Sequence, residues 1–599
     1  MGNGCRIVIG NAHHFSSNTE LSSKAHASGA VARAGGNPGG TNARRRRGAD
    51  FLAAACVAAL CGAVVRPAAA QTLDTPLAPG AGALIIDQQR QDRQPLAPPP
   101  AAAPPLPAPA AQAPVDTAPA TPLREIRVRG GAALGARLSE INARFAGRPL
   151  DAETIRAAAD AVSAAYADVG LALYTVAVPR QDLGQGVLTL VAVEGHIAQV
   201  DVSGDLTARE KKLIEAYGAK LTRERPLTRA SLERYLSLMR DIPGITVDAQ
   251  LYNLPAAGAV RLAVVAKIRH FQPELAVNNR GTPRLGTTQV QATLTGRGLF
   301  QAGDQAQVSA AVPTDIDRFQ YVGAAYGMPL GTEGLTLQLN ASYLRTRPKS
   351  PPIAGDAASA GMQLAYPIIR GYNRNLIARL GLDGLNSDNA IYGLSITSDH
   401  TRALRGSLGY SVVSPRRTFS ANVIGSLGLD GLGARADTRL TDADFKKLNV
   451  QVAFNQAIGK VAALRLRGLA QLSHGRLPAA EQLPLGGEQV GRAFYSAIVV
   501  GDRGYGGSAE LALITPKPWP TVLKGSEVYA FVDGGRARVR ARLPYAAAAD
   551  YDLASAGAGV RFLIKGKNVI GLEGARSLDT PYPGQGDAWR VIISWRFQR

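Results

Sequence analysis

Cysteine is nearly absent from this 599-residue chain, and so are long apolar runs. The three cysteines are Cys5, Cys56 and Cys61, so the chain beyond them has no disulfide framework, thiolate metal site or cysteine nucleophile. The longest apolar run, Phe51 to Val65, is shorter than the roughly 18–20 residues that a membrane helix needs. The sequence therefore excludes a helical membrane protein. It leaves open a membrane β-barrel, whose strands are shorter and weaker in signal.

Motifs of enzymes and metal sites are also missing. The histidines beyond position 70 lie far apart, at His196, His270, His400 and His474, and no H-E-x-x-H is present. There is no G-x-S-x-G, P-loop or strand-linked G-x-G-x-x-G. We therefore expect no enzyme activity, no cofactor and no metal. An outer-membrane esterase or protease is an alternative that no motif supports.

Acidic residues are outnumbered, with 46 Asp and Glu against 67 Lys and Arg and a formal net charge of +21. Such a balance can indicate nucleic-acid binding. Beyond position 70, however, the basic residues are scattered through glycine-rich, alternating segments instead of clustering in one motif. We therefore predict no nucleic-acid partner.

The first 70 residues have the order of a targeting segment. Arg44 to Arg47 precede the apolar run, and Ala68 to Ala70 precede Gln71. A positive region, a short apolar region and a small-residue site together indicate a signal peptide, here with a long n-region and cleavage after Ala70. The alternatives are a buried core helix and a twin-arginine export route.

Residues 71–122 are rich in alanine and proline, with Pro98 to Pro100 at their centre. Such a stretch cannot bury a core and is typical of an extended linker. Inside it, Ala81 to Gln94 lacks proline and contains helix formers, which predicts one short isolated helix.

Residues 123–270 contain the same strand–helix–helix–strand–strand order twice, in units 123–196 and 197–270. In the first unit we expect a strand at Glu125–Arg129, a helix carrying Leu134 and Phe145 on one face, and a helix capped by Asp151. Its last strands are expected at 172–179 and 186–193. The second unit is expected to have strands at 197–202, 246–252 and 259–267, and helices at 208–217 and 228–240. Repeats of this kind are typical of interaction platforms. One larger α+β domain is the alternative.

From residue 271 to 599 apolar and polar residues alternate with period two. The clearest segments are Leu335–Tyr343, Leu448–Phe454, Leu464–Leu472 and Trp589–Phe597. Segments of about ten residues suit tilted strands that cross a bilayer, and we count about sixteen of them, an even number as in outer-membrane barrels. A soluble β-sandwich would also alternate. The export signal, the even count and the terminal aromatic strand favour an antiparallel transmembrane β-barrel.

Several stretches resemble the two-partner secretion transporters, the haemolysin secretion/activation type of outer-membrane protein. Val178 to Leu183, followed by Gly186 to Ile197, resembles that family's first polypeptide-transport-associated (POTRA) domain, and Leu232 to Gly244 resembles the second. Asp502-Arg503-Gly504-Tyr505 resembles the family's Val-Arg-Gly-Tyr motif, which lies at the tip of a loop folded back into the pore. Phe531-Val-Asp533-Gly-Gly535 resembles its Phe-x-Asp-x-Gly motif on the barrel wall.

The resemblance implies a residue pair inside the barrel. Arg503, with Gly504 and Tyr505 beside it, is expected to pair with Asp533, which stands between Phe531 and Gly535. The alternative is that Arg503 is an ordinary loop charge. Asp502 departs from the pattern, which has Val there, and its carboxylate is expected to compete for Arg503. The helix at 81–94 corresponds in place to the family's plug helix.

By this resemblance, the protein secretes a large exoprotein from the periplasm to the cell surface of a Gram-negative bacterium. Two periplasmic POTRA domains would capture the unfolded partner, and the barrel, in contact with outer-membrane lipid, would conduct it. A final aromatic residue is usual as the signal to the barrel-assembly machinery during biogenesis; here the last strand reads Phe597-Gln598-Arg599, so Phe597, two residues inboard, would serve. The alternatives are a barrel-assembly and insertion factor of the same superfamily and a passive porin or adhesin barrel.

Overall fold

The computed structural model describes residues 121–349, 353–392, 394–514, 523–542, 547–565, 567–582 and 587–598. The predicted signal peptide at 1–70, nearly all of the linker, and the predicted helix at 81–94 lie outside these residues. In the part of the chain that is described, no helix is both long enough and apolar enough to cross a membrane.

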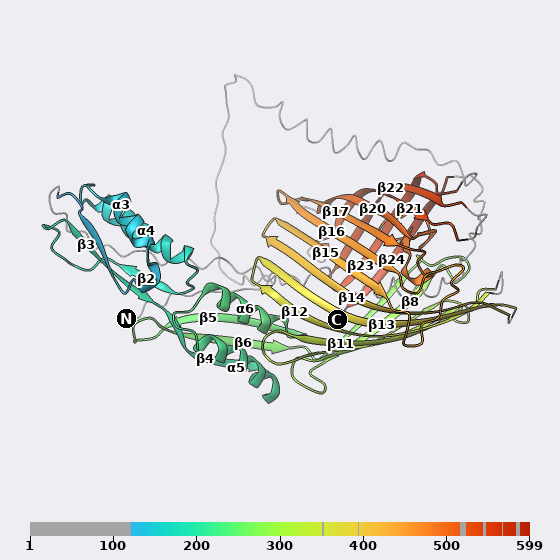
Figure 1. Ribbon diagram of the computed structural model, residues 1–599, viewed down its shortest axis with the longest axis horizontal. Coiled ribbons are helices and arrows are strands. Elements are labelled where there is room, and N and C mark those ends of the chain that lie inside the picture. The colour runs from blue at the N-terminus through green and yellow to red at the C-terminus, as the bar shows by residue number, and fades with distance from the viewer. Residues whose placement is uncertain are drawn as a thin grey trace, which may run out of the picture. The chain divides into compact units, whose positions relative to one another are not determined.

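The first α+β unit packs two helices against a three-stranded sheet (Figure 1). The strands lie in the order β1-β3-β2, with β1 parallel to β3 and β2 antiparallel to it. Its elements are β1 (Glu125–Arg129), η1 (Ala132–Leu134), α3 (Arg137–Phe145), α4 (Ala152–Asp168), β2 (Tyr174–Ala177) and β3 (Val187–Glu194). Phe145 and Tyr166 are among the largest fully buried side chains of its core.

The second unit repeats this arrangement, with strand order β4-β6-β5. Its elements are β4 (His196–Asp205), α5 (Ala208–Thr222), α6 (Arg229–Asp241), β5 (Ile245–Asn253) and β6 (Ala259–Ile268). Leu232, Leu236 and Met239 of α6 are buried in its core, as their helical spacing predicts. The repeat expected from the sequence is therefore present.

The helix ends follow local capping chemistry. The Asp151 carboxylate accepts a hydrogen bond from the Thr154 amide at 2.7 Å, so the predicted cap of α4 is confirmed. Thr207 and Glu210 form a reciprocal capping box at the start of α5. The predicted start of the helix that carries Phe145 was wrong, because Leu134 lies in the separate turn η1 and α3 begins at Arg137. Gly135, with φ of +50°, separates this turn from α3.

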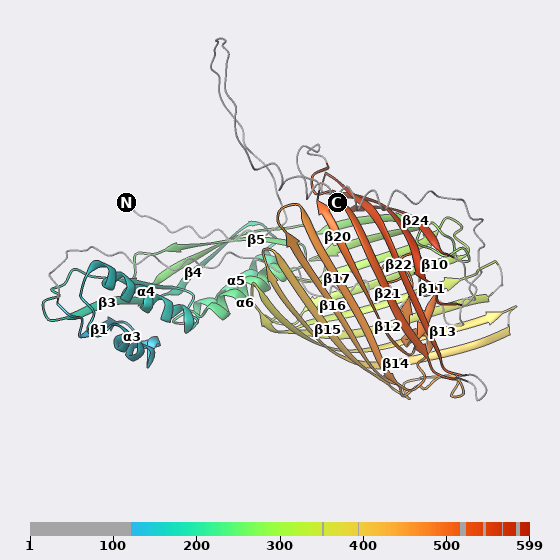
Figure 2. The same cartoon turned by 90° about the horizontal axis from the view of Figure 1, so that it is seen from above.

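In the described residues, sixteen strands form a closed antiparallel barrel, which confirms the predicted fold class (Figure 2). These strands are β7 (Phe271–Asn278), β8 (Gln289–Arg297), β9 (Gln305–Pro313), β10 (Phe319–Pro329), β11 (Thr336–Thr346), β12 (Ile353–Arg370), β13 (Arg374–Ile391), β14 (Leu394–Ser414), β15 (Arg417–Gly428), β16 (Lys446–Ile458), β17 (Ala462–His474), β20 (Arg503–Ile514), β21 (Glu527–Val539), β22 (Ala549–Ile564), β23 (Asn568–Asp579) and β24 (Trp589–Gln598). The last strand pairs with the first over Ser594–Gln598 and Glu274–Asn278, which closes the ring.

The two faces of the wall differ in polarity. On β20, Leu511 and Leu513 are exposed while Ser508 and Glu510 are buried. On β23, Leu572 is likewise exposed next to buried Glu573. Apolar side chains thus point outward and polar ones into the lumen, the pattern of a membrane barrel and the reverse of a sandwich.

Candidate functional site in the barrel lumen

Residues 475–502, between β17 and β20, form the luminal loop, which packs on the inner face of the wall. The loop contains the turn η2 (Ala479–Glu481) and a small hairpin of β18 (Leu483–Leu485) and β19 (Val499–Gly501). Leu485, Val490 and Phe494 are buried against wall side chains that include Phe531 and Leu553. Apolar packing therefore holds the loop inside the barrel.

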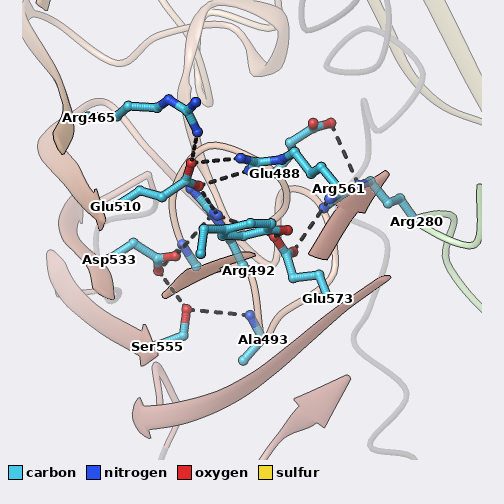
Figure 3. Close-up of polar contacts among 12 residues, drawn as sticks. Arg280, Arg465, Glu488, Arg492, Ala493, Glu510, Asp533, Ser555, Arg561 and Glu573 are labelled. Atoms are coloured by element: carbon cyan, nitrogen blue, oxygen red, sulfur yellow. Dashed lines mark hydrogen bonds and ion pairs between the residues drawn. The ribbon is translucent and has the colours of Figure 1, made fainter. Parts of the chain in front are cut away.

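Arg492 is the centre of the polar contacts between this loop and the wall (Figure 3). Its side chain is 6% exposed and lies 3.1 Å from Glu510 on β20 and 3.2 Å from Glu573 on β23. The Phe531 ring lies 4.0 Å from the guanidinium carbon, close enough for a cation–π contact. A buried guanidinium held by two carboxylates and a ring face is strongly positioned, because removing any partner leaves a buried charge less compensated.

Asp533 of β21 holds mainly the backbone of the loop. Its Oδ1 accepts hydrogen bonds of 2.6 Å from the Gly491 amide and 2.6 Å from the Ser555 hydroxyl. Its Oδ2 lies 3.7 Å from Nε of Arg492, which is an ion pair beyond hydrogen-bond range. Gly491 has φ of +78°, and a Cβ there would lie 2.8 Å from Leu553, so this position suits glycine.

Further charges extend the network along the wall. Arg561 lies 2.8 Å from Glu510 and 2.6 Å from Glu527, and Arg465 lies at the same distances from the same two carboxylates. Glu510 is therefore shared by three guanidinium groups, including that of Arg492, across strands β17, β20 and β22. Arg465 and Arg561 thus hold the Glu510 carboxylate on the wall at the point where Arg492 of the loop meets it.

The predicted pairing of Arg503 with Asp533 is wrong. Arg503 is the first residue of wall strand β20 and is exposed, and its side chain makes no hydrogen bond or ion pair with the described residues. Because side chains alternate along a strand, Arg503 and Tyr505 point to the outer face, where Tyr505 is 59% exposed. Gly504 lies between them in the wall and not at the tip of a loop.

Asp502 was also misjudged as a competitor for Arg503. It is fully buried, and its Oδ1 accepts a hydrogen bond from the Leu477 amide at 2.8 Å and lies 2.9 Å from Arg542. Its Oδ2 accepts a hydrogen bond from the Arg540 amide at 2.7 Å. Asp502 thus ties the end of the luminal loop to its beginning and to the segment after β21.

The barrel-wall half of the expected site lies where the loop binds. Phe531 and Asp533 are buried and touch the loop at Arg492 and Gly491, and a Cβ at Gly535 would lie 3.2 Å from Leu485. The loop residues that bind this part of the wall were not predicted. Their segment, Val490-Gly491-Arg492-Ala493-Phe494, resembles the Val-Arg-Gly-Tyr motif, but Gly precedes Arg and Ala493 stands before the aromatic residue. No group of three or more potential metal ligands was found among the described residues.

Two family models match this chain. The family model described as "Haemolysin secretion/activation protein ShlB/FhaC/HecB" matches residues 259–562, just over half of the chain, and "POTRA domain, ShlB-type" matches residues 121–195. The chain belongs to the haemolysin secretion/activation family. Members of this family are two-partner secretion transporters of the outer membrane with their POTRA domains in the periplasm, and this chain is one of them.

Individual relatives are distant in sequence. "Outer membrane transporter CdiB" of Dickeya dadantii (strain 3937) is 25% identical over 447 residues, covering 69% of this chain and 75% of the relative. "Heme/hemopexin transporter protein HuxB" of Haemophilus influenzae (strain 86-028NP) is 19% identical over 458 residues, covering 74% and 80%. Among solved structures, "CdiB from Escherichia coli" has a TM-score of 0.71 at 20% identity, covering 87% of this chain and 99% of that one. This last likeness shows the fold alone.

Proposed function

We propose that this family member exports one large exoprotein, and that the POTRA domains capture it as an unfolded chain. The POTRA sheets have β1 and β2 as the outer strands of one and β4 and β5 as the outer strands of the other. Outer strands present backbone donors and acceptors that an extended chain can pair with, largely independently of its side chains. We place the two domains at residues 123–196 and 197–270 and the barrel at 271–599.

The barrel lumen would conduct the captured chain once the luminal loop moves. The loop is held by charged and apolar contacts that can form again after the cargo has passed. The sequence contains no nucleotide-binding motif. Folding of the exoprotein outside the cell would therefore supply the direction. The apolar outer face would contact lipid, after insertion by the barrel-assembly machinery.

The observation that carries this proposal is the buried Arg492 between Glu510 and Glu573. We expect Arg492→Ala to lower secretion of the exoprotein by roughly tenfold or more, because the loop then loses the buried ion pairs that return it to the wall after each cargo chain, a loss of several kcal/mol. The measurement is the amount of exoprotein in the culture medium, with the barrel quantified in the outer-membrane fraction. Comparing the secreted proteins of the deletion strain with those of the parent first identifies the exoprotein.

Arg503→Ala is the matched control, since it also removes an arginine side chain, but from the outer face of strand β20, which follows the luminal loop. We expect it to secrete normally. Normal secretion by Arg492→Ala would remove the role proposed for the luminal loop. Loss of secretion by Arg503→Ala alone would restore the motif assignment made from the sequence.

A further inference from the structure

The luminal loop has a second polar attachment, at its beginning and on another part of the wall. The turn η2 places Glu481 against inward-facing side chains of β14 and β16. These strands are separate from β20, β21 and β23, which bind Arg492. The two attachments therefore share no wall strand.

The Glu481 carboxylate bridges two cations. Its Oε1 lies 2.6 Å from Nη2 of Arg405, and its Oε2 lies 2.7 Å from Nζ of Lys447. All three side chains are largely buried, with exposed fractions of 3% for Glu481, 17% for Arg405 and 4% for Lys447. Charge-assisted hydrogen bonds of this length and burial are the strong class of polar contact.

The backbone of the same turn is bound as well. The Glu481 carbonyl accepts hydrogen bonds from Lys447 Nζ at 2.9 Å and from Gln471 Nε2 at 3.1 Å. Arg405 is itself oriented by Asp383 at 3.0 Å and by the Ser426 hydroxyl at 2.9 Å. The guanidinium that binds this carboxylate of the loop is thus itself held by neighbours on the wall.

Two buried cations face the lumen here with Asp383 as their wall carboxylate. When Glu481 is present the four charges balance. When the turn leaves, Arg405 and Lys447 exchange the Glu481 carboxylate for water, and the short charge-assisted hydrogen bonds are lost, which opposes departure.

We propose that Glu481 is a second latch, which must release together with the Arg492 attachment before the lumen opens. A loop attached at one point can swing about that point, whereas attachments to two stretches of wall hold it in place inside the barrel. The second latch therefore sets how rarely the empty transporter opens. This inference goes beyond the proposed secretion function, because it concerns the resting pore without its cargo.

The test is the ion conductance of the purified full-length protein in planar bilayers, with no exoprotein present. We expect Glu481→Gln to raise the fraction of time in open states about tenfold or more, the change that about 1.4 kcal/mol produces in an equilibrium. The glutamine keeps the size and the backbone contacts of the turn while removing its charge. Glu488→Gln is the matched control, since Glu488 is in the same loop but is 66% exposed and 3.7 Å from Arg280.

Equal open fractions for Glu481→Gln and Glu488→Gln would overturn the proposal. If the Glu481→Gln variant does not insert, Glu481→Asp is measured instead. The aspartate keeps the charge but is too short to reach both cations, so we expect a smaller rise in the open fraction. A Glu481→Asp pore as closed as that of the unchanged chain would likewise contradict the latch. Since the readout needs no exoprotein, its failure is distinct from failure of the secretion proposal.

Discussion

At the scale of single residues, glycines of the wall make room for the luminal loop. A Cβ at Gly504 would lie 2.3 Å from the Arg536 carbonyl oxygen and 3.0 Å from Leu483 of the loop. A Cβ at Gly535 would lie 2.7 Å from the Tyr505 carbonyl oxygen and 3.2 Å from Leu485. Because these two glycines have no side chains, the hairpin of β18 and β19 can pack directly on the backbone of the wall. The last Gly of Phe-x-Asp-x-Gly is therefore explained by close approach.

We predict that Gly535→Ala weakens the seating of the luminal loop. The added methyl group meets backbone atoms of β20, which cannot rotate away, so the wall or the loop must shift at a cost of roughly 1–3 kcal/mol. The measurement is the thermal unfolding midpoint of the full chain in detergent. Gly574→Ala, on β23, is the control because a Cβ there meets nothing within 4 Å. Equal midpoints for the two variants would show that the wall accommodates a methyl group at residue 535 and would contradict this prediction.

At the scale of elements, α6 of the second POTRA domain is bound to the end of strand β12 and to the turn before β11. Asp241, at its end, makes a bidentate pair with Arg370 of β12, at 2.6 Å and 2.7 Å. Arg234 donates hydrogen bonds to the carbonyls of Pro367 at 2.9 Å and Glu333 at 2.8 Å. A forked guanidinium pair fixes orientation as well as distance, so α6 couples this domain to the barrel, together with Lys220 of α5, which contacts Glu333.

We predict that this coupling weakens in acid through Glu333, in the turn before β11. Its pKa lies below the ordinary value of 4.5, chiefly because Lys220 donates a hydrogen bond to it and Tyr235 adds another. A lowered folded-state pKa means that the stabilisation is complete above the ordinary pKa and is lost as the pH falls through the lowered one. Glu333→Gln should therefore unfold at lower temperature than the unchanged chain near neutral pH, and the difference should disappear in acid.

The measurement is the unfolding midpoint of both proteins in detergent as a function of pH. Because Glu333 is half exposed, a modest difference is expected. Glu215→Gln is the control, since its carboxylate pairs with Lys211 on the same helix and not with the barrel. A difference between unchanged chain and Glu333→Gln that stays constant across pH would contradict the role of this carboxylate.

The sequence predicts these elements well because strands and amphipathic helices are local patterns. The alternation around Leu448 and Trp589, for example, is enough to place β16 and β24. The luminal contacts are not local, since Arg492 reaches Glu510 and Glu573 at separations of 18 and 81 residues. The alternation of side chains could have corrected the assignment of Arg503 to the lumen. In a strand that runs from Arg503 through Leu511, both side chains point to the same face, and Leu511 belongs to the apolar outer face. No sequence period indicates that Glu481 meets Arg405, 76 residues away.

At the scale of the whole molecule, the barrel contributes to the core of a periplasmic domain. Tyr372, in the turn between β12 and β13, is 5% exposed and belongs to the core cluster of the second POTRA domain. Its backbone amide donates a hydrogen bond to Glu233 of α6 at 3.2 Å. Its ring lies beside Arg240, with 5.7 Å between guanidinium carbon and ring centroid. The Tyr372 side chain therefore links the apolar core of this domain to the barrel.

We predict that Tyr372→Ala loosens the second POTRA domain, while Tyr372→Phe does not. Truncating a buried aromatic side chain to alanine costs roughly 3–5 kcal/mol, from lost burial and from the cavity. The Tyr372 hydroxyl, in contrast, is buried with no hydrogen-bond partner among the described residues. Removing it should leave stability unchanged or raise it by about 1 kcal/mol.

The measurement is hydrogen–deuterium exchange of the full chain in detergent, read over α6 and β5. Tyr372→Ala should speed exchange there and leave the barrel strands β20–β23 unchanged, because the lost contacts belong to the periplasmic core. Tyr392→Ala is the control, since that side chain is 80% exposed. If α6 and β5 exchanged at the same rate in Tyr372→Ala and Tyr392→Ala, the turn between β12 and β13 would not contribute to the stability of the second POTRA domain. Motion of the POTRA domain would then reach the barrel through polar contacts, and substitutions of Asp241 and Arg234 on α6 and of Lys220 on α5 would be the ones to change it.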